Sequence, residues 1–270
     1  MKLEVEDFRF SYGREEILKG ISLQAESGLT TIIGPNGAGK STFVKCLAGV
    51  LKPSSGTASF GGENLLTVKG MKTDVRMAYM PQEQPHFTSL SVLEVVLLGR
   101  VRELGLKVNE KDIDTAYGSL ERLNLEEFAK RPFNELSGGQ SQMVMIAQCL
   151  ASEPDFIILD EPINNLDIRR ELEMFEVMDE ITRKDNLTTL MILHDINMAS
   201  KYSDNLAVFR EGEMHSFGKP ADIISEEMLR DVYGIEAHVE MCRGVPRIDP
   251  LCACKCQRRK CCGGDVVEIE

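Results

Sequence analysis

The stretch that decides the fold is Gly34-Pro35-Asn36-Gly37-Ala38-Gly39-Lys40-Ser41-Thr42. It has the spacing G-x-x-x-x-G-K-S, which is typical of a loop that binds phosphate. The β-branched run 29–33 in front of it predicts a buried strand, and the apolar residues at helical spacing in 42–49 predict a helix behind it. Strand, loop and helix therefore follow one another in the order that such a loop requires.

The residue types of this loop suit a bound anion. Glycines let successive backbone N–H groups turn toward phosphate oxygens without hindrance from a Cβ, and the start of the following helix adds a positive field. Lys40 would reach the β- and γ-phosphates, while the hydroxyl of Ser41 would bind Mg²⁺. We therefore expect all residues from Gly34 to Thr42 to form part of a site for a nucleoside triphosphate and Mg²⁺. An ordinary glycine-rich turn would not need this register.

The composition is that of a globular chain with an excess of acid. Its 270 residues allow one large domain or two smaller ones, and the formal net charge is −12. This charge argues against nucleic acid as the main partner, because nucleic-acid backbones attract clustered Lys and Arg. No apolar run approaches the ~18 residues that cross a bilayer, and residues 1–6 alternate like a strand rather than resembling a signal peptide. A cytoplasmic protein is expected.

Strand-like and helical patterns alternate along most of the chain. Helical patterns gather in the middle, at 91–100, 109–123, 126–130 and 141–151, and form a block over about 84–152. Such an order predicts an α/β fold with a helical insertion between the halves of its core. Besides 29–33, strands are expected at residues 1–10, 17–25, 57–60, 75–80, 156–159 and 188–193, and a hairpin at 205–217.

An acidic pair, Asp160-Glu161, ends the continuous apolar run 156–159, which is the pattern of a central parallel strand. Asp160 would hold Mg²⁺ directly or through water, and Glu161 would stand beside the γ-phosphate and polarise the attacking water. Acidic residues at a strand end are common by themselves. Their combination with the loop at 34–42 favours the catalytic interpretation.

A second glycine-rich helix start, Ser137-Gly138-Gly139-Gln140, opens the helical pattern of 141–151. Its unhindered N–H groups and the helix dipole present another anion site. The chain offers only one candidate aromatic to stack on adenine, Tyr12, and a lone turn tyrosine is more often a surface residue. The chain thus offers two candidate anion sites but one candidate aromatic for adenine. The simplest interpretation is that the second anion site serves a partner chain.

Together these residues resemble those of the ATP-binding cassette (ABC) family over about residues 1–240. The resemblance implies a P-loop NTPase core of mostly parallel sheet, with an antiparallel β subdomain and a helical signature subdomain at about 84–152. The matching elements, in family terms, are Walker A (34–42), Walker B (156–160), the signature (136–140), the Q-loop glutamine (Gln82), the D-loop (Leu166-Asp167), the switch histidine (His194) and the adenine-stacking aromatic (Tyr12).

The resemblance further implies an ATPase that needs Mg²⁺ and works as a head-to-tail dimer. Each ATP would lie between one subunit's loop and Ser137 and Gly139 of the other subunit. Gln82 would contact Mg²⁺ or water, and His194 would contact the γ-phosphate, although either residue type is more often structural when it stands alone. The departures leave every phosphate and metal ligand in place: Ser141, Met143 and Gln148 stand where many relatives carry basic residues, and Ile163 replaces a common threonine.

Within the family, residues 91–100, 164–167 and 233–235 look like segments of importers of iron–siderophore, haem and cobalamin. This implies a peripheral subunit on the cytoplasmic face of the membrane, with polytopic permease subunits as partners and a solute-binding protein as an indirect partner. A soluble ABC ATPase with another task is the alternative. The second cassette or coiled-coil insertion that such proteins often have is absent from the sequence.

Six of the eight cysteines crowd into residues 242–262, between basic residues. Thiolates so close together could bind a soft metal, and nearby cations favour the thiolate form. Yet C-x-C-x-C is not zinc-finger spacing, and the flanks predict no fold of their own. Two interpretations of a tail over 241–270 stay open: a solvated, reduced segment, or a sensor of the transported metal. Cys46 and Cys149 are expected in the core.

Overall fold

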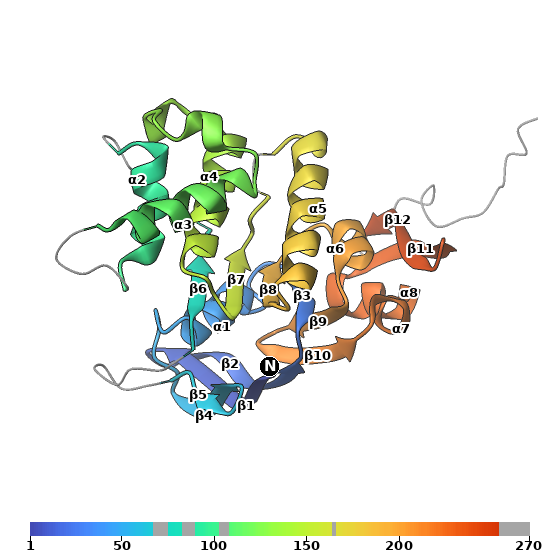
Figure 1. The fold of residues 1–270 in the computed structure, drawn as a ribbon. Coiled ribbons are helices and arrows are strands. Elements are labelled where there is room, and N and C mark those ends of the chain that lie inside the picture. Colours follow the sequence, from blue (N-terminus) through green and yellow to red (C-terminus); the bar gives the residue numbers. More distant parts are fainter. Residues whose placement is uncertain (67–74, 83–89, 103–107, 164–165, 254–270) are drawn as a thin grey trace, which may run out of the picture.

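The computed structural model describes residues 1–66, 75–82, 90–102, 108–163 and 166–253 (Figure 1). Three layers are arranged around one six-stranded sheet. An antiparallel sheet lies below it in the figure, a group of helices lies above it, and a C-terminal hairpin lies at one side. Residues 164–165, which entered the comparison with importers, and the cysteines from Cys254 onward lie outside the described residues.

The central sheet has the strand order β10-β9-β3-β8-β7-β6, and all neighbours except β9 and β10 run parallel. Every residue of β7 and β8 is buried, because helices cover both faces of a parallel sheet. This burial explains the continuous apolar runs in their sequences. The strands are β3 (Gly28–Ile33), β6 (Met77–Met80), β7 (Phe156–Asp160), β8 (Thr188–Ile192), β9 (Asn205–Arg210) and β10 (Glu213–Gly218).

A second, antiparallel sheet has the order β2-β1-β4-β5 and is joined to the first through helix α1 (Lys40–Leu47). Phe43 of α1 packs edge-on against Phe8 of one sheet and Phe209 of the other, with ring centroids 5.8 and 5.3 Å apart. These buried rings fix α1, and hence the loop before it, between the sheets. The strands are β1 (Leu3–Tyr12), β2 (Glu15–Ala25), β4 (Ser55–Phe60) and β5 (Glu63–Asn64).

The helical insertion lies between β6 and β7, which are neighbours in the central sheet. Its α2 (Val92–Leu97), α3 (Glu110–Glu121) and α4 (Gly138–Ala151) pack on one another around a shared apolar core. Each begins with a capping box, in which a side chain before the helix and a side chain in its first turn satisfy backbone N–H groups reciprocally. The predicted α/β fold with an antiparallel sheet and a helical subdomain is confirmed.

The C-terminal part differs from expectation. After α5 (Ile168–Lys184), α6 (Ile196–Tyr202), α7 (Pro220–Ile223), α8 (Glu226–Met228) and a π-helical turn (Leu229–Tyr233), the strands β11 (Ile235–Cys242) and β12 (Val245–Ala253) form an antiparallel hairpin. The sequence predicted a domain boundary at residue 240 and no fold in the residues that follow it. For residues 241–253 this prediction is wrong. Arg243 and Gly244 make the connecting turn with φ of 53° and 83°, and Ala237 and Ile248 are buried beneath the hairpin.

The described cysteines lie either in the core or on the C-terminal hairpin. Cys46 and Cys149 are buried, as expected, and burial raises the pKa of both thiols to about 12. Cys242 is exposed at the turn of the hairpin, and Cys252 is half-buried on β12. Within the described ranges, no three residues among Cys, His, Asp and Glu come together as a metal site.

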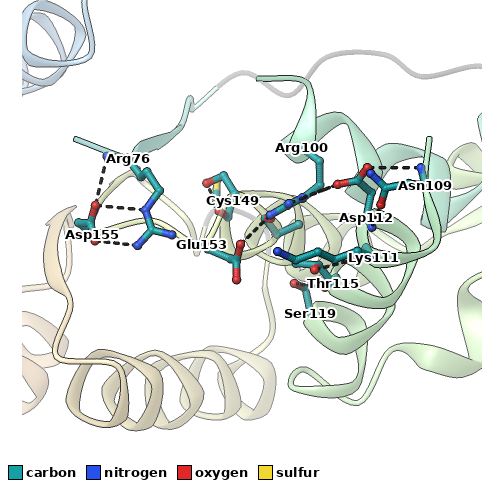
Figure 2. A network of polar contacts seen from close by, with 12 residues as sticks. Arg76, Arg100, Asn109, Lys111, Asp112, Thr115, Ser119, Cys149, Glu153 and Asp155 are labelled. Carbon is teal, nitrogen blue, oxygen red and sulfur yellow. Dashed lines mark hydrogen bonds and ion pairs between the residues drawn. The ribbon is translucent and has the colours of Figure 1, made fainter. Parts of the chain in front are cut away.

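A buried arginine ties the helical subdomain together (Figure 2). Arg100, only 4% exposed, donates to Asp112 Oδ1 on α3 at 3.2 Å, to Glu153 Oε2 at 2.8 Å and to the Ala151 carbonyl oxygen at the end of α4 at 3.2 Å. The guanidinium therefore joins the end of α2 to both other helices of the subdomain. Because Asp112 is itself 2% exposed, loss of Arg100 would leave a buried carboxylate without its ion-pair partner.

Replacing Arg100 by alanine should lower the free energy of unfolding by about 3–5 kcal/mol, because Asp112 is left charged and buried without its partner. Urea denaturation followed by circular dichroism measures the change. Arg169→Ala is the matched control, since this 87% exposed arginine pairs with Glu173 on the surface of α5 and should cost at most about 1 kcal/mol. Equal losses of unfolding free energy in the two variants would contradict the larger contribution expected from the buried ion pair.

Candidate functional site

The carboxyl ends of four neighbouring parallel strands, β3, β8, β7 and β6, meet at one edge of the central sheet. Loop 34–42 follows β3, Asp160-Glu161 ends β7, Gln82 follows β6 and His194 follows β8. Ligands of open α/β sheets bind at this edge, because the connections there diverge and leave a crevice. The strand order therefore brings together four segments that are distant in sequence.

The phosphate loop depends on glycine at its first position. Gly34 has a φ of 147°, and a Cβ added to it would lie 2.2 Å from the carbonyl oxygen of Phe209 on β9. Gly37 and Gly39 have φ of 81° and 95°, a region that side chains disfavour. The backbone of the loop thus lies directly against β9 and curls around the start of α1.

Lys40 lies inside the curl of the loop with only 5% of its surface exposed. Its Nζ donates to the carbonyl oxygens of Gly34 and Pro35 at 2.7 and 3.0 Å. Burial lowers the pKa of Lys40, and the charges of Glu161 and Asp160 act in the opposite direction. The ammonium is thereby held in the concave side of the loop, where phosphate oxygens would replace the carbonyls as acceptors.

Asp160 and Ser41 offer oxygen ligands side by side. The hydroxyl of Ser41 donates to Asp160 Oδ1 at 3.2 Å, and Asp160 is fully buried at the tip of β7. Burial raises the pKa of Asp160, the nearby Glu161 adds to the rise, and the hydrogen bond from Ser41 opposes it. A hydroxyl and a buried carboxylate at this separation are hard oxygen donors that fit Mg²⁺, whose charge would relieve the cost of burial.

Glu161 joins the remaining candidate residues. Gln82 Nε2 donates to Glu161 Oε2 at 2.6 Å, and His194 Nε2 lies 2.6 Å from Glu161 Oε1. Glu161 is 7% exposed and has a φ of 54°, an uncommon conformation for a residue with a side chain. The three side chains predicted to be catalytic therefore meet at one carboxylate, each from a different strand end.

A cavity of about 270 Å³ opens between these groups. Tyr12 stands at its mouth, 54% exposed, with its ring edge-on to Phe10 at 4.7 Å between centroids. An exposed aromatic face beside a phosphate-binding loop is suited to a flat base. The cavity is lined by Tyr12, Ile17, Asn36, Gly37, Gly39, Lys40, Ser41, Thr42, Glu161 and His194.

The other predicted residues do not line this cavity. Ser137 caps α4, where its Oγ accepts from the N–H of Gln140 at 3.4 Å and its own N–H donates to Gln140 Oε1 at 3.0 Å. Ser137 and Gly138 are exposed, whereas Gly139 is buried against Arg170 and Leu166. Asp167 caps α5 by accepting from the N–H of Arg170 at 3.0 Å. Within one chain, the helix start at residues 137–140 is therefore separate from the cavity beside loop 34–42.

Comparison with known proteins agrees with this geometry. The sequence profile of the family described as ABC transporter matches residues 18–164, which is more than half of the chain. This chain belongs to the ABC transporter family. ATP-binding subunits of ABC import systems hydrolyse ATP, form dimers and work with membrane permeases, and this chain is such an ATPase. No helix in the part of the chain that the structure describes is long and apolar enough to cross a membrane.

Similar ABC proteins include named importer subunits. The chain is 34% identical to the petrobactin import ATP-binding protein FpuD of Bacillus anthracis over 240 residues, 88% of each chain. It is 33% identical to the hemin import ATP-binding protein HmuV of Bordetella avium over 248 residues, 88% of this chain and 94% of that one. A solved ABC transporter ascribed to the metal-chelate type, in an inward-facing conformation, aligns with a TM-score of 0.79 at 26% identity, covering 92% of this chain and 97% of that one.

Two tyrosines near the ABC site were not predicted to be site residues, although Tyr233 belongs to a segment that resembles importers. The hydroxyl of Tyr79 on β6 lies 3.5 Å from Asp160 Oδ2, and burial raises its pKa. Tyr233 reaches the loop from the C-terminal part: burial raises its pKa, and a hydrogen bond with the backbone of Gly34 opposes the rise. Tyr79 could have been predicted as a site residue, because it lies shortly before Pro81-Gln82. No sequence signal connects Tyr233 with Gly34.

Replacing Gly34 by alanine should weaken ATP binding about tenfold or more, since the new Cβ displaces the loop from β9 and binding must then supply ~1–3 kcal/mol of strain. Titration with a fluorescent ATP analogue measures the affinity. Gly118→Ala is the matched control, because a Cβ at this position on α3 meets nothing within 4 Å. An unchanged affinity of a folded Gly34→Ala protein would contradict the close packing described above.

Proposed function

We propose that this chain is the ATP-hydrolysing subunit of an importer of the iron–siderophore, haem or cobalamin type. The observation that carries its chemistry is the meeting of Gln82, Glu161 and His194 beside the phosphate loop, with separations of 2.6 Å. Glu161 acts as the general base, His194 contacts the γ-phosphate, and Gln82 orients the carboxylate and the attacking water.

The binding roles follow from the residues around the cavity. Residues 34–42 cradle the phosphates with backbone N–H groups, Lys40 neutralises the β- and γ-phosphates, and Tyr12 stacks on adenine. Ser41 and Asp160, with Gln82 at the edge, would hold Mg²⁺, which supplies positive charge where negative charge develops on the phosphoryl oxygens. Burial of Asp160 and Lys40 supports these roles, because electrostatic interactions are stronger away from water.

The hydrolytic step uses the position of Glu161. A water between Glu161 and the γ-phosphate would give its proton to a carboxylate oxygen as its own oxygen attacks phosphorus, while the bond from phosphorus to the β,γ-bridging oxygen breaks and ADP leaves. With Gln82 on one carboxylate oxygen and His194 on the other, rotation of the carboxylate is restricted before the substrate arrives. Such preorganisation reduces the reorganisation needed in the transition state.

The separate signature motif supports a head-to-tail dimer as the active form. Ser137, Gly138, Gly139 and Gln140 form a helix start that is exposed at Ser137 and Gly138 and does not line the cavity of its own chain. In the dimer this helix start would close over the γ-phosphate bound by the partner's loop, and Asp167 would lie near the same interface. Two ATP molecules would thus be enclosed between two chains.

The transport role is supported by the similarity to FpuD and HmuV, whose names specify petrobactin and hemin import. The chain would lie peripherally on the cytoplasmic face of the membrane, with polytopic permease subunits as direct partners and a solute-binding protein as an indirect one. A soluble ATPase, or a metal sensor acting through the cysteine-rich tail, is not favoured by these relatives. Co-purification with a polytopic membrane protein, rather than with ribosomes, tests the assignment.

Glu161→Gln should reduce ATP hydrolysis by about 10²–10⁴-fold, which is ~3–5 kcal/mol of transition-state stabilisation, because the amide cannot accept the proton from water. ATP binding should survive, since the loop and Tyr12 are intact. Steady-state phosphate release and nucleotide titration measure the two effects. The control is Glu173→Gln on the surface of α5, which should hydrolyse ATP normally. Hydrolysis at the parental rate by Glu161→Gln would exclude this residue as the base.

Gly138→Trp should prevent dimerisation while leaving ATP binding by one chain unchanged. Gly138 is exposed and a Cβ there meets nothing within 4 Å, so the indole fits the single chain but would occupy the space of the partner's nucleotide. Light scattering of the Glu161→Gln protein with ATP should give a dimer, and of Glu161→Gln/Gly138→Trp a monomer. The control is Glu161→Gln/Gly118→Trp, with the tryptophan on α3, which should give a dimer. If Glu161→Gln/Gly138→Trp also gives a dimer, the composite site is contradicted.

A further inference from the structure

The hairpin β11–β12 is fastened to α6 by side chains that capture its backbone. Asn197 Nδ2 donates to the carbonyl oxygen of Ile248 at 3.1 Å, and the N–H of Ile248 donates to Asn197 Oδ1 at 2.8 Å. Ser200, one turn further along α6 and 3% exposed, donates through Oγ to the carbonyl oxygen of Pro246 at 2.8 Å. One face of α6 is therefore hydrogen-bonded to consecutive parts of β12.

Apolar packing supports the same attachment. Ile248 and Ala237 of the hairpin are each 5% exposed, and Ala199 of α6 is fully buried in the same core cluster. In Figure 1 the hairpin lies beside α6 at the edge of the molecule. A two-stranded hairpin is marginally stable by itself, so this attachment to α6 is needed for its position. Conversely, the hairpin restrains a helix of only seven residues.

Helix α6 begins immediately after the switch histidine. Asp195 caps it by accepting from the N–H of Met198 at 3.0 Å, and His194 directly precedes this cap. Asn197 lies in the first turn, so less than one turn of helix separates its attachment from His194. A rotation or shift of α6 therefore moves His194 relative to Glu161, from which its Nε2 is 2.6 Å away.

We propose that Asn197 is a positioning residue, which holds His194 against Glu161 by fixing α6 to the hairpin β11–β12. The inference rests on the proposed function of His194 in hydrolysis. The family profile matches residues 18–164. The proposal therefore gives a role in hydrolysis to α6 and the hairpin, which lie outside the matched residues. Displacements of about 1 Å at catalytic groups cost as much as 10²-fold in rate, so a short and firmly attached helix is useful here.

The test compares ATP hydrolysis by Asn197→Ala and by the full-length parental chain. The variant should lower kcat about tenfold and leave KM for ATP unchanged, since the hydrogen bonds that Asn197 makes in the described part of the chain go to Ile248 and not to the phosphate loop or Tyr12. Asn197→Asp should behave similarly, because a carboxylate oxygen then faces the Ile248 carbonyl oxygen without a proton between them. Asn64→Ala is the matched control: Asn64 also accepts from a backbone N–H, that of Leu66, but on the antiparallel sheet.

Two further measurements separate positioning from a general structural effect. In a His194→Ala background, measured by single-turnover hydrolysis, adding Asn197→Ala should cause no further loss of rate, because both changes then act on one missing contact. In ¹⁵N-histidine-labelled protein, Asn197→Ala should shift the imidazole resonances of His194, whereas Asn64→Ala should not.

Each outcome decides the proposal. Equal losses from Asn197→Ala with and without His194, or unchanged His194 resonances, overturn it. If Asn197→Ala does not fold, Ser200→Ala and Asn197→Asp are measured with and without His194 in its place. Equal losses of rate in the two backgrounds then overturn the proposal. A parental rate in His194→Ala alone would instead contradict the proposed function of His194, and the resonance measurement would still decide whether Asn197 positions the ring.

Discussion

The contacts of Glu161 with Gln82 and His194 are the constraint on which the arrangement of the site depends. Gln82 stands where the chain leaves the central sheet for the helical insertion, and His194 stands where it enters α6. Both contact the carboxylate at 2.6 Å. Two peripheral parts of the protein therefore meet at the group assigned to activate water, and a change in either part would alter the geometry of that group.

Buried charge makes this edge of the sheet sensitive to its ligands. Asp160, Glu161 and Lys40 are each at most 7% exposed, and burial raises the pKa of Asp160 and lowers that of Lys40. The attraction between the ammonium of Lys40 and the carboxylate of Asp160 depends on their geometry. In the proposed function, a nucleotide with Mg²⁺ would add charges of both signs here, and its binding would couple to the position of β7 and the loop.

Most of the central architecture could be predicted because it follows from local chain properties. Glycines at positive φ, apolar runs and helix-capping residues act over a few neighbours, so β3, loop 34–42 and the helices of the insertion were predicted where they occur. The hairpin was missed although residues 235–241 alternate between apolar and polar side chains, because the crowded cysteines from Cys242 onward favoured the interpretation as a tail. The contact of Tyr233 with Gly34 was missed because it depends on packing across the whole chain.

The amino-acid sequence by itself determined the order of the motifs, the chemistry of the loop and the residue types able to bind phosphate, Mg²⁺ and water. The tertiary structure decided which of them meet. Strand order β3-β8-β7-β6 joins the tips that carry the loop, His194, Glu161 and Gln82, while Ser137 is held at another place as the cap of α4. The physical reason is that strand neighbours are selected by burial and hydrogen bonding over the whole sheet, which no short segment encodes.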